Sequence, residues 1–344
     1  MDLAQDVAAR PAQGGADVTF LVREKRAAQI AANGLVIESP NGNAVIPVKT
    51  VTAQAVGRDY DLVLFTCKAY DLDSAMGAIA PAMAGAAVVP MLNGIAHLER
   101  LDARFGKSKV MGGTCQINIT LLADGTVKHM EPLNSFTFGE RDGTESVRAK
   151  AFAAELAKTS IDWTLSSTIE QDMWEKLLFL SVLAAVTCLF RGNIGEILAA
   201  PGGRETIERA LAGNVAIVTK CATVPREKAV QWATTRLLTP GPAASSMLRD
   251  VERGNPVEAD QVGGFMRERA RQHGIDDFQN GVADDIHRLR AIDELDPLRF
   301  LRGDDAEPVG HALKEFPVRF LKVIPLEFQL QRGLTRAHPL RADF

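Results

Sequence analysis

Short runs of consecutive apolar residues alternate with longer amphipathic segments in the first half of the chain. The runs at residues 18–22, 61–66 and 86–92 are apolar at successive positions rather than at every second one. That pattern is typical of strands buried on both faces of a parallel sheet. The intervening segments 24–33 and 72–83 have helical character. Strand, helix and strand at this spacing predict βαβ units and a doubly wound sheet.

The section that follows is rich in turns and predicts antiparallel pairing. Asp124-Gly125 separates two apolar runs and is a strong hairpin signal. We expect short strands at residues 117–122, 127–130 and 135–139, a helix at 144–158 and a strand near 162–165. The α/β half should end near residues 166–168.

From residue 168 to about residue 290 the pattern becomes almost entirely helical. Thr168 and Gln171 predict a capping box at the start of the first helix. The apolar run at 177–190 has 14 residues, fewer than the roughly 20 that span a bilayer, so we expect a buried helix. Further helices are expected at residues 205–223, after Pro225, and at 257–273 with Gly274 as its stop.

The pattern divides the chain into an α/β half at residues 1–167, a helical half at 168–292 and a tail at 293–344. The tail does not fit the plan of the other two parts. It has mixed charge and no clear period, and it contains Pro297, Pro308, Pro317, Pro325 and Pro339. We expect it to pack loosely or to be disordered.

Composition excludes several classes of partner. Acidic residues outnumber basic ones, 43 to 39, and aromatic residues make up 6% of the chain. Without a basic block or stacking residues, nucleic acid is not an expected partner. The four cysteines are widely scattered, which favours reduced thiols over a metal knuckle. Residues 1–10 lack an apolar segment typical of an export signal, so a cytoplasmic location without a membrane is expected.

Lys176 is the first candidate for chemistry. On a helix it shares one stripe with Asp172, Leu180 and Leu183. A lysine on an otherwise apolar stripe is partly desolvated, and desolvation lowers its pKa toward the range useful for proton transfer. The alternative is a first-turn lysine that reaches solvent beside Glu175.

A hydroxyl and a carboxylate follow in the helical half. Ser246 should lie near one helix, and Glu258 should lie at the start of the next. Together they could bind a small polar substrate and hold an ammonium group. The alternative is two helix caps and a solvated face.

Two polar residues follow apolar strands of the α/β half. Asn93 comes after the run at 86–92, and Lys68 comes after the run at 61–66. The carboxyl ends of parallel strands are where ligands bind in such sheets. Asn93-Gly94 could instead be an ordinary turn, and Lys68 an ordinary loop lysine.

These elements occur in an order that resembles the ketopantoate reductases (2-dehydropantoate 2-reductases), with similarity over about residues 15–273. The matching segments are Phe20-Leu21-Val22-Arg23, Lys68-Ala69-Tyr70, Leu92-Asn93-Gly94, Trp174-Glu175-Lys176, Ser245-Ser246-Met247-Leu248-Arg249-Asp250 and Glu258-Ala259-Asp260. The resemblance implies an incomplete Rossmann-like doubly wound sheet followed by an all-helical domain, as in 6-phosphogluconate-dehydrogenase-like proteins. Residues 1–167 would then be the dinucleotide-binding domain and 168–292 the helical substrate domain.

The resemblance also implies roles for single residues. Lys176 would be the general acid for the substrate carbonyl, and Asn93 and Ser246 would hold the substrate. Glu258 would orient the lysine and contact the cofactor side, where Asn93 also lies.

NADPH is the cofactor that the family uses. Arg23 would face the 2′-phosphate that distinguishes NADPH from NADH, and Lys68 would lie near the cofactor phosphates or the nicotinamide. The guanidinium fork of an arginine suits a phosphate group.

The chain departs from the family pattern in three respects. It has no G-x-G-x-x-G turn, whose backbone amides would bind the pyrophosphate, and the first strand and this loop are missing by alignment from Val18. Pro11 falls where the first helix is expected. Leu180 stands one turn after the lysine, where the family often has an asparagine.

We therefore expect NADPH-dependent reduction of 2-dehydropantoate to D-pantoate, the reaction of pantothenate biosynthesis. One alternative is a non-catalytic, degenerate member that binds the cofactor poorly. Another is a reductase of a different small 2-keto acid, which Leu180 permits. The expected partner is a small 2-keto acid, and a homodimer is left open. No metal is expected.

Overall fold

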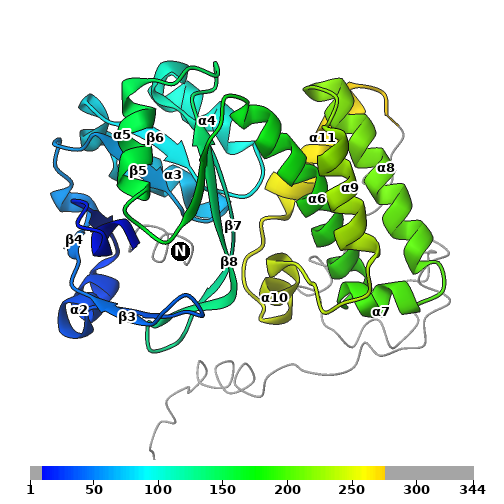
Figure 1. Cartoon of the computed structure of the whole chain (residues 1–344), viewed down its shortest axis with the longest axis horizontal. Helices are drawn as coiled ribbons and strands as arrows, with labels where there is room; N and C mark the ends of the chain where they lie inside the picture. Colours follow the sequence, from blue (N-terminus) through cyan, green and yellow to red (C-terminus); the bar gives the residue numbers. More distant parts are fainter. Residues whose placement is uncertain (1–9, 276–344) are drawn as a thin grey trace, which may run out of the picture. The chain divides into compact units, whose positions relative to one another are not determined.

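The computed structural model describes residues 10–275, and the tail predicted at 293–344 lies outside them. The described residues belong to one compact unit, Met1–Arg290. An α/β half comes first and a helical half follows (Figure 1). This order confirms the predicted fold class.

The α/β half runs from β1 to β9. Its α-helices and strands are β1 (Thr19–Leu21), α2 (Glu24–Asn33), β2 (Leu35–Glu38), β3 (Ala44–Ile46), β4 (Lys49–Val51), β5 (Leu62–Phe65), α3 (Leu72–Ala78), β6 (Ala87–Pro90), α4 (His97–Phe105), β7 (Gly112–Leu121), β8 (Val127–Gly139), α5 (Val147–Leu156) and β9 (Asp162–Leu165). Short 3-10 helices include η2 (Ala69–Asp71), which follows β5, and η3 (Ala80–Ala84).

The strands of the described residues pair in three separate ladders rather than in one sheet. β1 pairs in parallel with β4, and β5 pairs in parallel with β6. The third ladder has the order β3-β2-β8-β7, and β9 pairs in parallel with β8. Before β1, residues 10–13 are helical and end at a turn in which Gly15 has φ +89°. Pro11 therefore lies within a short helix, at the place where the first helix was expected.

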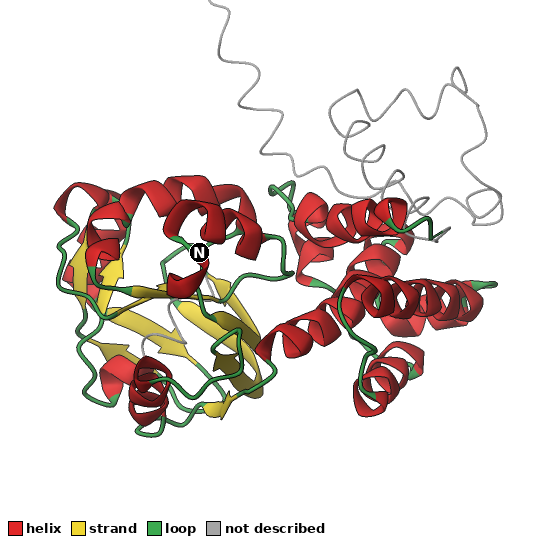
Figure 2. Cartoon of the chain, turned by 90° about the horizontal axis from the view of Figure 1, so that it is seen from above, coloured by secondary structure: helices red, strands yellow, loops and turns green. Residues whose placement is uncertain are grey.

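The β7–β8 hairpin forms one side of the junction between the two halves (Figures 1 and 2). The predicted turn at Asp124-Gly125 is present, and Gly125 has φ +87°. The two predicted strands after the turn are one strand, β8, whose pairing with β7 is interrupted between Ile117 and Ile119. Pro132 lies in the unpaired part of β8, where its missing N–H leaves no ladder bond unmade.

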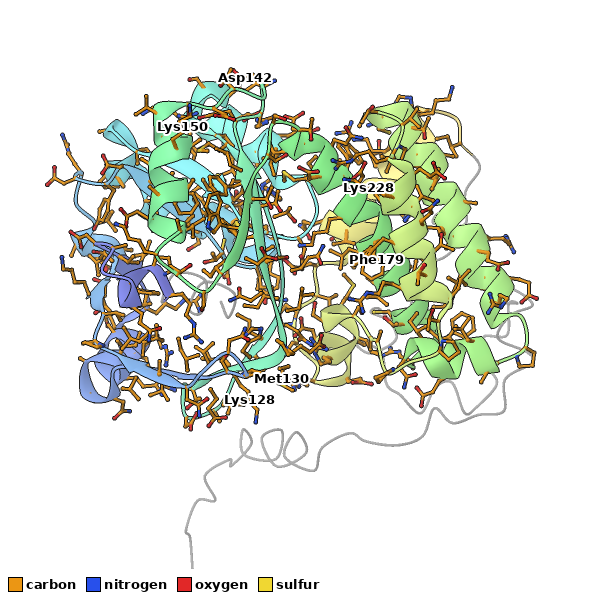
Figure 3. The ribbon with its side chains drawn as sticks, in the orientation of Figure 1. Lys128, Met130, Asp142, Lys150, Phe179 and Lys228 are labelled. Carbon is orange, nitrogen blue, oxygen red and sulfur yellow. The ribbon has the colours of Figure 1, made fainter. Side chains whose placement is uncertain are left out.

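The helical half consists of helices that pack around α6. They are α6 (Ile169–Phe190), α7 (Ile194–Ala199), α8 (Gly203–Cys221), α9 (Glu227–Leu238), α10 (Ser246–Glu252), the π-helix η5 (Asp260–Gly264) and α11 (Phe265–Gln272). Phe179 of α6 contacts the ring of Trp232 of α9 edge to face, with centroids 4.7 Å apart (Figure 3). Helix α6 is long and apolar enough to cross a membrane, but 67% of its most apolar window is buried inside the structure. It packs as a core helix, as the sequence predicted.

Two local predictions need correction. The capping box at Thr168 is wrong, because the Thr168 side chain makes no cap bond; Ser166 Oγ accepts from the Thr168 amide and also bonds Asp172. The helix expected at 257–273 begins later. Glu258 precedes it outside any helix or strand, and a π-helical turn occupies its first part.

Candidate active site

Lys176 lies on the second turn of α6 and faces the α/β half. Its Nζ donates to the carbonyl oxygen of Cys115 on β7 at 2.6 Å and to Oδ1 of Asn93 at 3.3 Å. Burial of the amine lowers the pKa of Lys176 below its ordinary 10.5, while the negative charge of Glu258 acts in the opposite direction. The solvent-seeking alternative for this lysine is therefore wrong. The amine is desolvated and held in one position.

Asn93 lies just after β6, at the carboxyl end of a parallel strand. The turn is real, since Gly94 has φ +83°, and a Cβ on Gly94 would lie 2.9 Å from the Gln261 carbonyl oxygen. Glycine is therefore required where this loop approaches η5. The turn and the ligand role coexist, because the turn directs the Asn93 side chain to Lys176.

Lys68 and Glu258 form a second link across the junction. Lys68 Nζ donates to Glu258 Oε2 at 3.3 Å and to Asp250 Oδ2 at 3.1 Å. Glu258 Oε1 also accepts from the backbone N–H of Ala69 at 2.9 Å. Burial opposes the charge on Lys68, but the two carboxylates outweigh it and raise the pKa of Lys68 above its ordinary value. Lys68 therefore stays an ammonium ion at neutral pH.

Glu258 acts on the two lysines differently. It contacts Lys68 directly, and it influences Lys176 through its charge. The groups that fix the position of Lys176 are Asn93 and the Cys115 carbonyl. Among the described residues, the predicted orienting contact from Glu258 to Lys176 is not a hydrogen bond, and the influence of Glu258 on this lysine is through charge.

Ser246 is the first residue of α10. The helix cap is its neighbour Ser245, whose hydroxyl accepts from the Leu248 N–H and also bonds Thr187 of α6. Within residues 10–275 the Ser246 hydroxyl makes no hydrogen bond. It is not the cap that the alternative interpretation required, and it is available to a ligand.

Arg23 follows β1 and is the N-cap residue of α2. Its side chain is 75% exposed, and its guanidinium contacts Asp71 at 3.2 Å. The structure does not bring Arg23 to the Lys176 cluster. It places the residue between β1 and α2.

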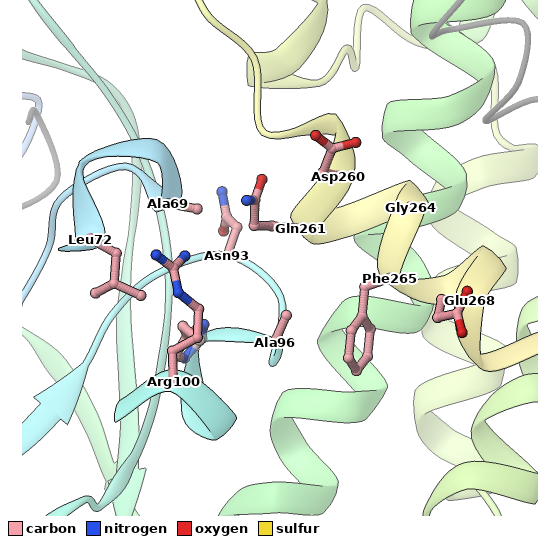
Figure 4. A pocket seen from close by; sticks show the side chains of 11 residues that line it. Ala69, Leu72, Asn93, Ala96, Arg100, Asp260, Gln261, Gly264, Phe265 and Glu268 are labelled. Atoms are coloured by element: carbon pink, nitrogen blue, oxygen red, sulfur yellow. The ribbon is translucent and has the colours of Figure 1, made fainter. Parts of the chain in front are cut away.

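A pocket of about 280 Å³ lies beside Asn93 (Figure 4). The α/β half contributes His97 and Arg100 of α4, and the helical half contributes Gln261 and Phe265. His97 is buried, and its Nε2 has no hydrogen-bond partner among the described residues. Burial, reinforced by Lys176 and Arg141, lowers the pKa of His97 to about 3, so this imidazole is neutral.

Sequence reasoning missed three contributors to this region. The Cys115 carbonyl is a backbone group 61 residues from its lysine, and no side-chain pattern reports it. Asp250 was part of a recognised segment, but its partner Lys68 is 182 residues away. His97 lies three residues after Gly94. Nothing in the neighbouring sequence indicated that this histidine would be buried.

The described residues define a two-part protein with a half-buried, hydrogen-bonded lysine at the junction of an α/β half and a helical half. The chain matches the family Ketopantoate reductase PanE/ApbA at residues 5–143 and its C-terminal part at residues 168–277. It belongs to the ketopantoate reductase family and is an oxidoreductase.

Similar proteins include members with and without an assigned substrate. The chain is 35% identical to "Uncharacterized oxidoreductase YkpB" of Bacillus subtilis, over 77% of this chain and 88% of the relative. It is 27% identical to the 2-dehydropantoate 2-reductase of Halobacterium salinarum, again over 77% and 88%. Its fold is similar to that of D-mandelate dehydrogenase solved with NADH and anilino(oxo)acetate, with a TM-score of 0.73, 16% identity, and coverage of 82% of this chain and 93% of that one.

Proposed function

We propose that the protein reduces 2-dehydropantoate to D-pantoate with NADPH. One observation carries the proposal: the Lys176 amine is desolvated at the junction of the two halves and is fixed by Asn93 and the Cys115 carbonyl. Such an amine has few competing partners and can deliver its proton to an oxygen that develops negative charge. Family membership and the named relative in Halobacterium support the same reaction.

Each residue of the cluster has a separate task in this reaction. Lys176 Nζ holds a proton over the substrate's 2-oxo oxygen and releases it as that oxygen becomes an alkoxide. Asn93 and Ser246 bind the substrate through their amide and hydroxyl groups. The charge of Glu258 opposes the loss of the proton from Lys176 before the substrate arrives.

The described residues also fit the reactive end of a nicotinamide cofactor. Lys68 and Asn93 lie at the carboxyl ends of the parallel pair β5 and β6, where a nucleotide binds in an open α/β sheet. Arg23 is exposed and has a fork suited to a 2′-phosphate. When bound, the cofactor supplies the hydride for the 2-oxo carbon.

The direct test is turnover by the purified full chain. NADPH oxidation should be seen with 2-dehydropantoate, and the product should be the D enantiomer of pantoate. No oxidation with this substrate, under conditions where NADPH binds, would exclude the proposed substrate.

A second candidate function is reduction of another small 2-oxo acid. Leu180 lies one turn after Lys176 on α6 and is half-buried, so an apolar side chain stands next to the lysine on its helix. An apolar pocket wall offers no partner to the hydroxyl of 2-dehydropantoate. A higher kcat/KM for 2-oxoisovalerate, which lacks that hydroxyl, would favour this second function.

The third reading, a member with poor cofactor binding and no catalysis, is tested by titration. Absence of saturable NADPH binding would support it. We further propose a cytoplasmic protein, because all four cysteines are free thiols, and a homodimer, which sedimentation of the full chain would detect.

A further inference from the structure

Arg249 of α10 reaches across the same junction as Lys176, at a different point of β7. Its Nη2 donates to Oδ1 of Asn118 at 2.9 Å. Asn118 in turn donates from Nδ2 to Oε1 of Glu131 on β8 at 2.9 Å. The amide therefore presents its oxygen to the arginine, and the guanidinium is held by a neutral group.

Asn118 lies where the β7–β8 ladder is interrupted. The register passes from Ile117 opposite Asn134 to Ile119 opposite His129, and Asn118 has no partner residue on β8. Irregularities of this kind re-aim a side chain out of the ladder. Here the re-aimed side chain bridges to α10, from which Asp250 also reaches the α/β half through Lys68.

The cations at the junction are unequally neutralised. Lys68 makes ion pairs with Asp250 and Glu258. Within residues 10–275 neither Lys176 nor Arg249 makes an ion pair with a carboxylate. The Arg249 guanidinium is half-buried, so it has lost part of its hydration, and no carboxylate compensates for that free-energy cost. Charge-assisted hydrogen bonds to an anionic ligand would compensate for it.

The two cations contact β7 at residues three positions apart, a separation on the scale of a 2-oxo acid with a hydrogen bond at each end. Lys176 contacts the carbonyl of Cys115 and Arg249 contacts the side chain of Asn118, and three residues of strand extend for about 10 Å. A carbonyl oxygen and a carboxylate oxygen of a 2-oxo acid lie about 3 Å apart, and hydrogen bonds of about 2.9 Å at each end give a span of about 9 Å.

We infer that Arg249 binds the carboxylate of the substrate, and that Asn118 is the positioning residue for its guanidinium. The inference rests on the proposed function for the identity of the substrate as a 2-oxo acid. Lys176 would then meet the keto oxygen while Arg249 holds the acid group. This division selects 2-oxo acids over neutral ketones.

A binding experiment tests the inference without turnover. Oxamate, the amide isostere of a 2-oxo acid, is titrated into the purified full chain by calorimetry in the presence of NADPH. Arg249→Gln should weaken oxamate binding roughly 10- to 100-fold, because charge-assisted hydrogen bonds are lost. Arg249→Lys, which keeps the charge and loses the fork, should give an intermediate value. Arg253→Gln is the matched control, because Arg253 is exposed just after α10.

Steady-state kinetics provide a second readout. Arg249→Gln should raise the KM for the 2-oxo acid by a similar factor and leave kcat within about threefold, because the carboxylate does not react. With the methyl ester of the same acid, the variant and the unmodified protein should have equal KM. Asn118→Ala, which leaves the arginine in place, should raise KM for the acid roughly threefold to tenfold with unchanged kcat.

Several results would overturn the inference. They are undiminished oxamate binding by Arg249→Gln, absence of oxamate binding by the unmodified chain at millimolar concentration, and a loss confined to NADPH affinity, which would assign Arg249 to the cofactor. If Arg249→Gln fails to fold, as judged by its thermal melt, the Asn118→Ala result decides. Oxamate binding that depends on Arg249 in a protein that reduces no 2-oxo acid would refute the proposed function and uphold the inference.

Discussion

On the α/β side of the junction, the groups that contact Lys176 and Glu258 include an amide side chain and two backbone groups: Oδ1 of Asn93, the carbonyl of Cys115 and the N–H of Ala69. On the helical side, the groups in these contacts are the amine of Lys176 and the carboxylate of Glu258. Apart from the Lys68 ammonium, the α/β half thus supplies fixed dipoles, and the helical half supplies the amine of Lys176 and the carboxylate of Glu258. Changes on the helical side should alter chemistry and its pH dependence, whereas changes on the α/β side should alter position and cofactor affinity.

The sharpest test of this division is Lys176→Ala. Removing a general acid costs about 10²–10⁴-fold in rate, so kcat for 2-oxo acid reduction should fall by at least that much. NADPH affinity should stay nearly unchanged, because the substitution leaves Asn93, Lys68 and Arg23 of the α/β half in place. Lys220→Ala, at an exposed position of α8, is the control. Near-normal turnover of Lys176→Ala would mean that the proton comes from another group.

A second test separates stability from chemistry within the helical half. Arg226 pairs with Asp172 and Glu175 at the start of α6, on the turn that carries Lys176. Arg226→Ala leaves the buried Glu175 carboxylate uncompensated and should lower the free energy of unfolding by about 1–3 kcal/mol, as for a partly buried pair. Chemical denaturation measures the loss, and Arg236→Ala on α9 is a control at a partly exposed position.

Arg226→Ala should also change how the stability of the fold depends on pH. Burial alone would raise the pKa of Glu175, but the hydrogen bonds from Arg226 outweigh it and hold this pKa below its ordinary 4.5. A carboxyl with a depressed folded-state pKa stabilises the fold above its unfolded pKa and loses that contribution as pH falls through the folded value. Without Arg226, stability should therefore begin to fall at a higher pH. An unchanged acid profile would contradict this account of the network.

Glu258→Gln should have a smaller effect and should displace a pH profile. Glutamine can still accept from the Ala69 N–H, so the geometry is kept while the negative charge that raises the pKa of Lys176 is removed. Lys176 must be protonated to act as an acid, so reduction is lost as pH rises through its pKa, which lies below 10.5. In the variant this loss should begin at lower pH, with a decrease in kcat/KM of roughly tenfold at neutral pH.

Measurement of kcat/KM from pH 6 to pH 10 checks this prediction. Glu252→Gln removes the same charge at an exposed position of α10 and should leave the profile in place. A shift in the opposite direction would show that Glu258 does not support the protonated lysine.

Some parts of the site could be predicted from the sequence and others could not. Consecutive apolar runs located β5 and β6, so the positions of Lys68 and Asn93 at their ends could be predicted. The apolar stripe of α6 located Lys176 on a core helix. These are consequences of local periodicity, which an unaligned sequence contains.

Other parts of the site depend on contacts that no periodicity reports. Asn118 and Arg249 are 131 residues apart, and their bond depends on an interruption of the β7–β8 ladder. Local pattern predicted two strands where β8 is one, because Pro132 resembles a break and is in fact accommodated in the unpaired part. The π-helical turn η5 was also missed, since it carries the same residues as a regular helix start would.

The remaining prediction concerns Arg23, on the α/β side and outside the Lys176 cluster. Its side chain is 75% exposed and has one ion-pair partner, Asp71, so a ligand phosphate would replace a weak surface contact. Arg23→Ala should weaken NADPH binding about tenfold, as expected for loss of a charge-assisted contact, and leave NADH binding unchanged. Lys25→Ala, an exposed cation on the following helix, is the matched control for long-range charge. Fluorescence titration with both nucleotides measures the ratio. If both affinities fall equally, Arg23 contributes general attraction to the nucleotide rather than discrimination, and the basis for NADPH preference must lie at another residue of the α/β half.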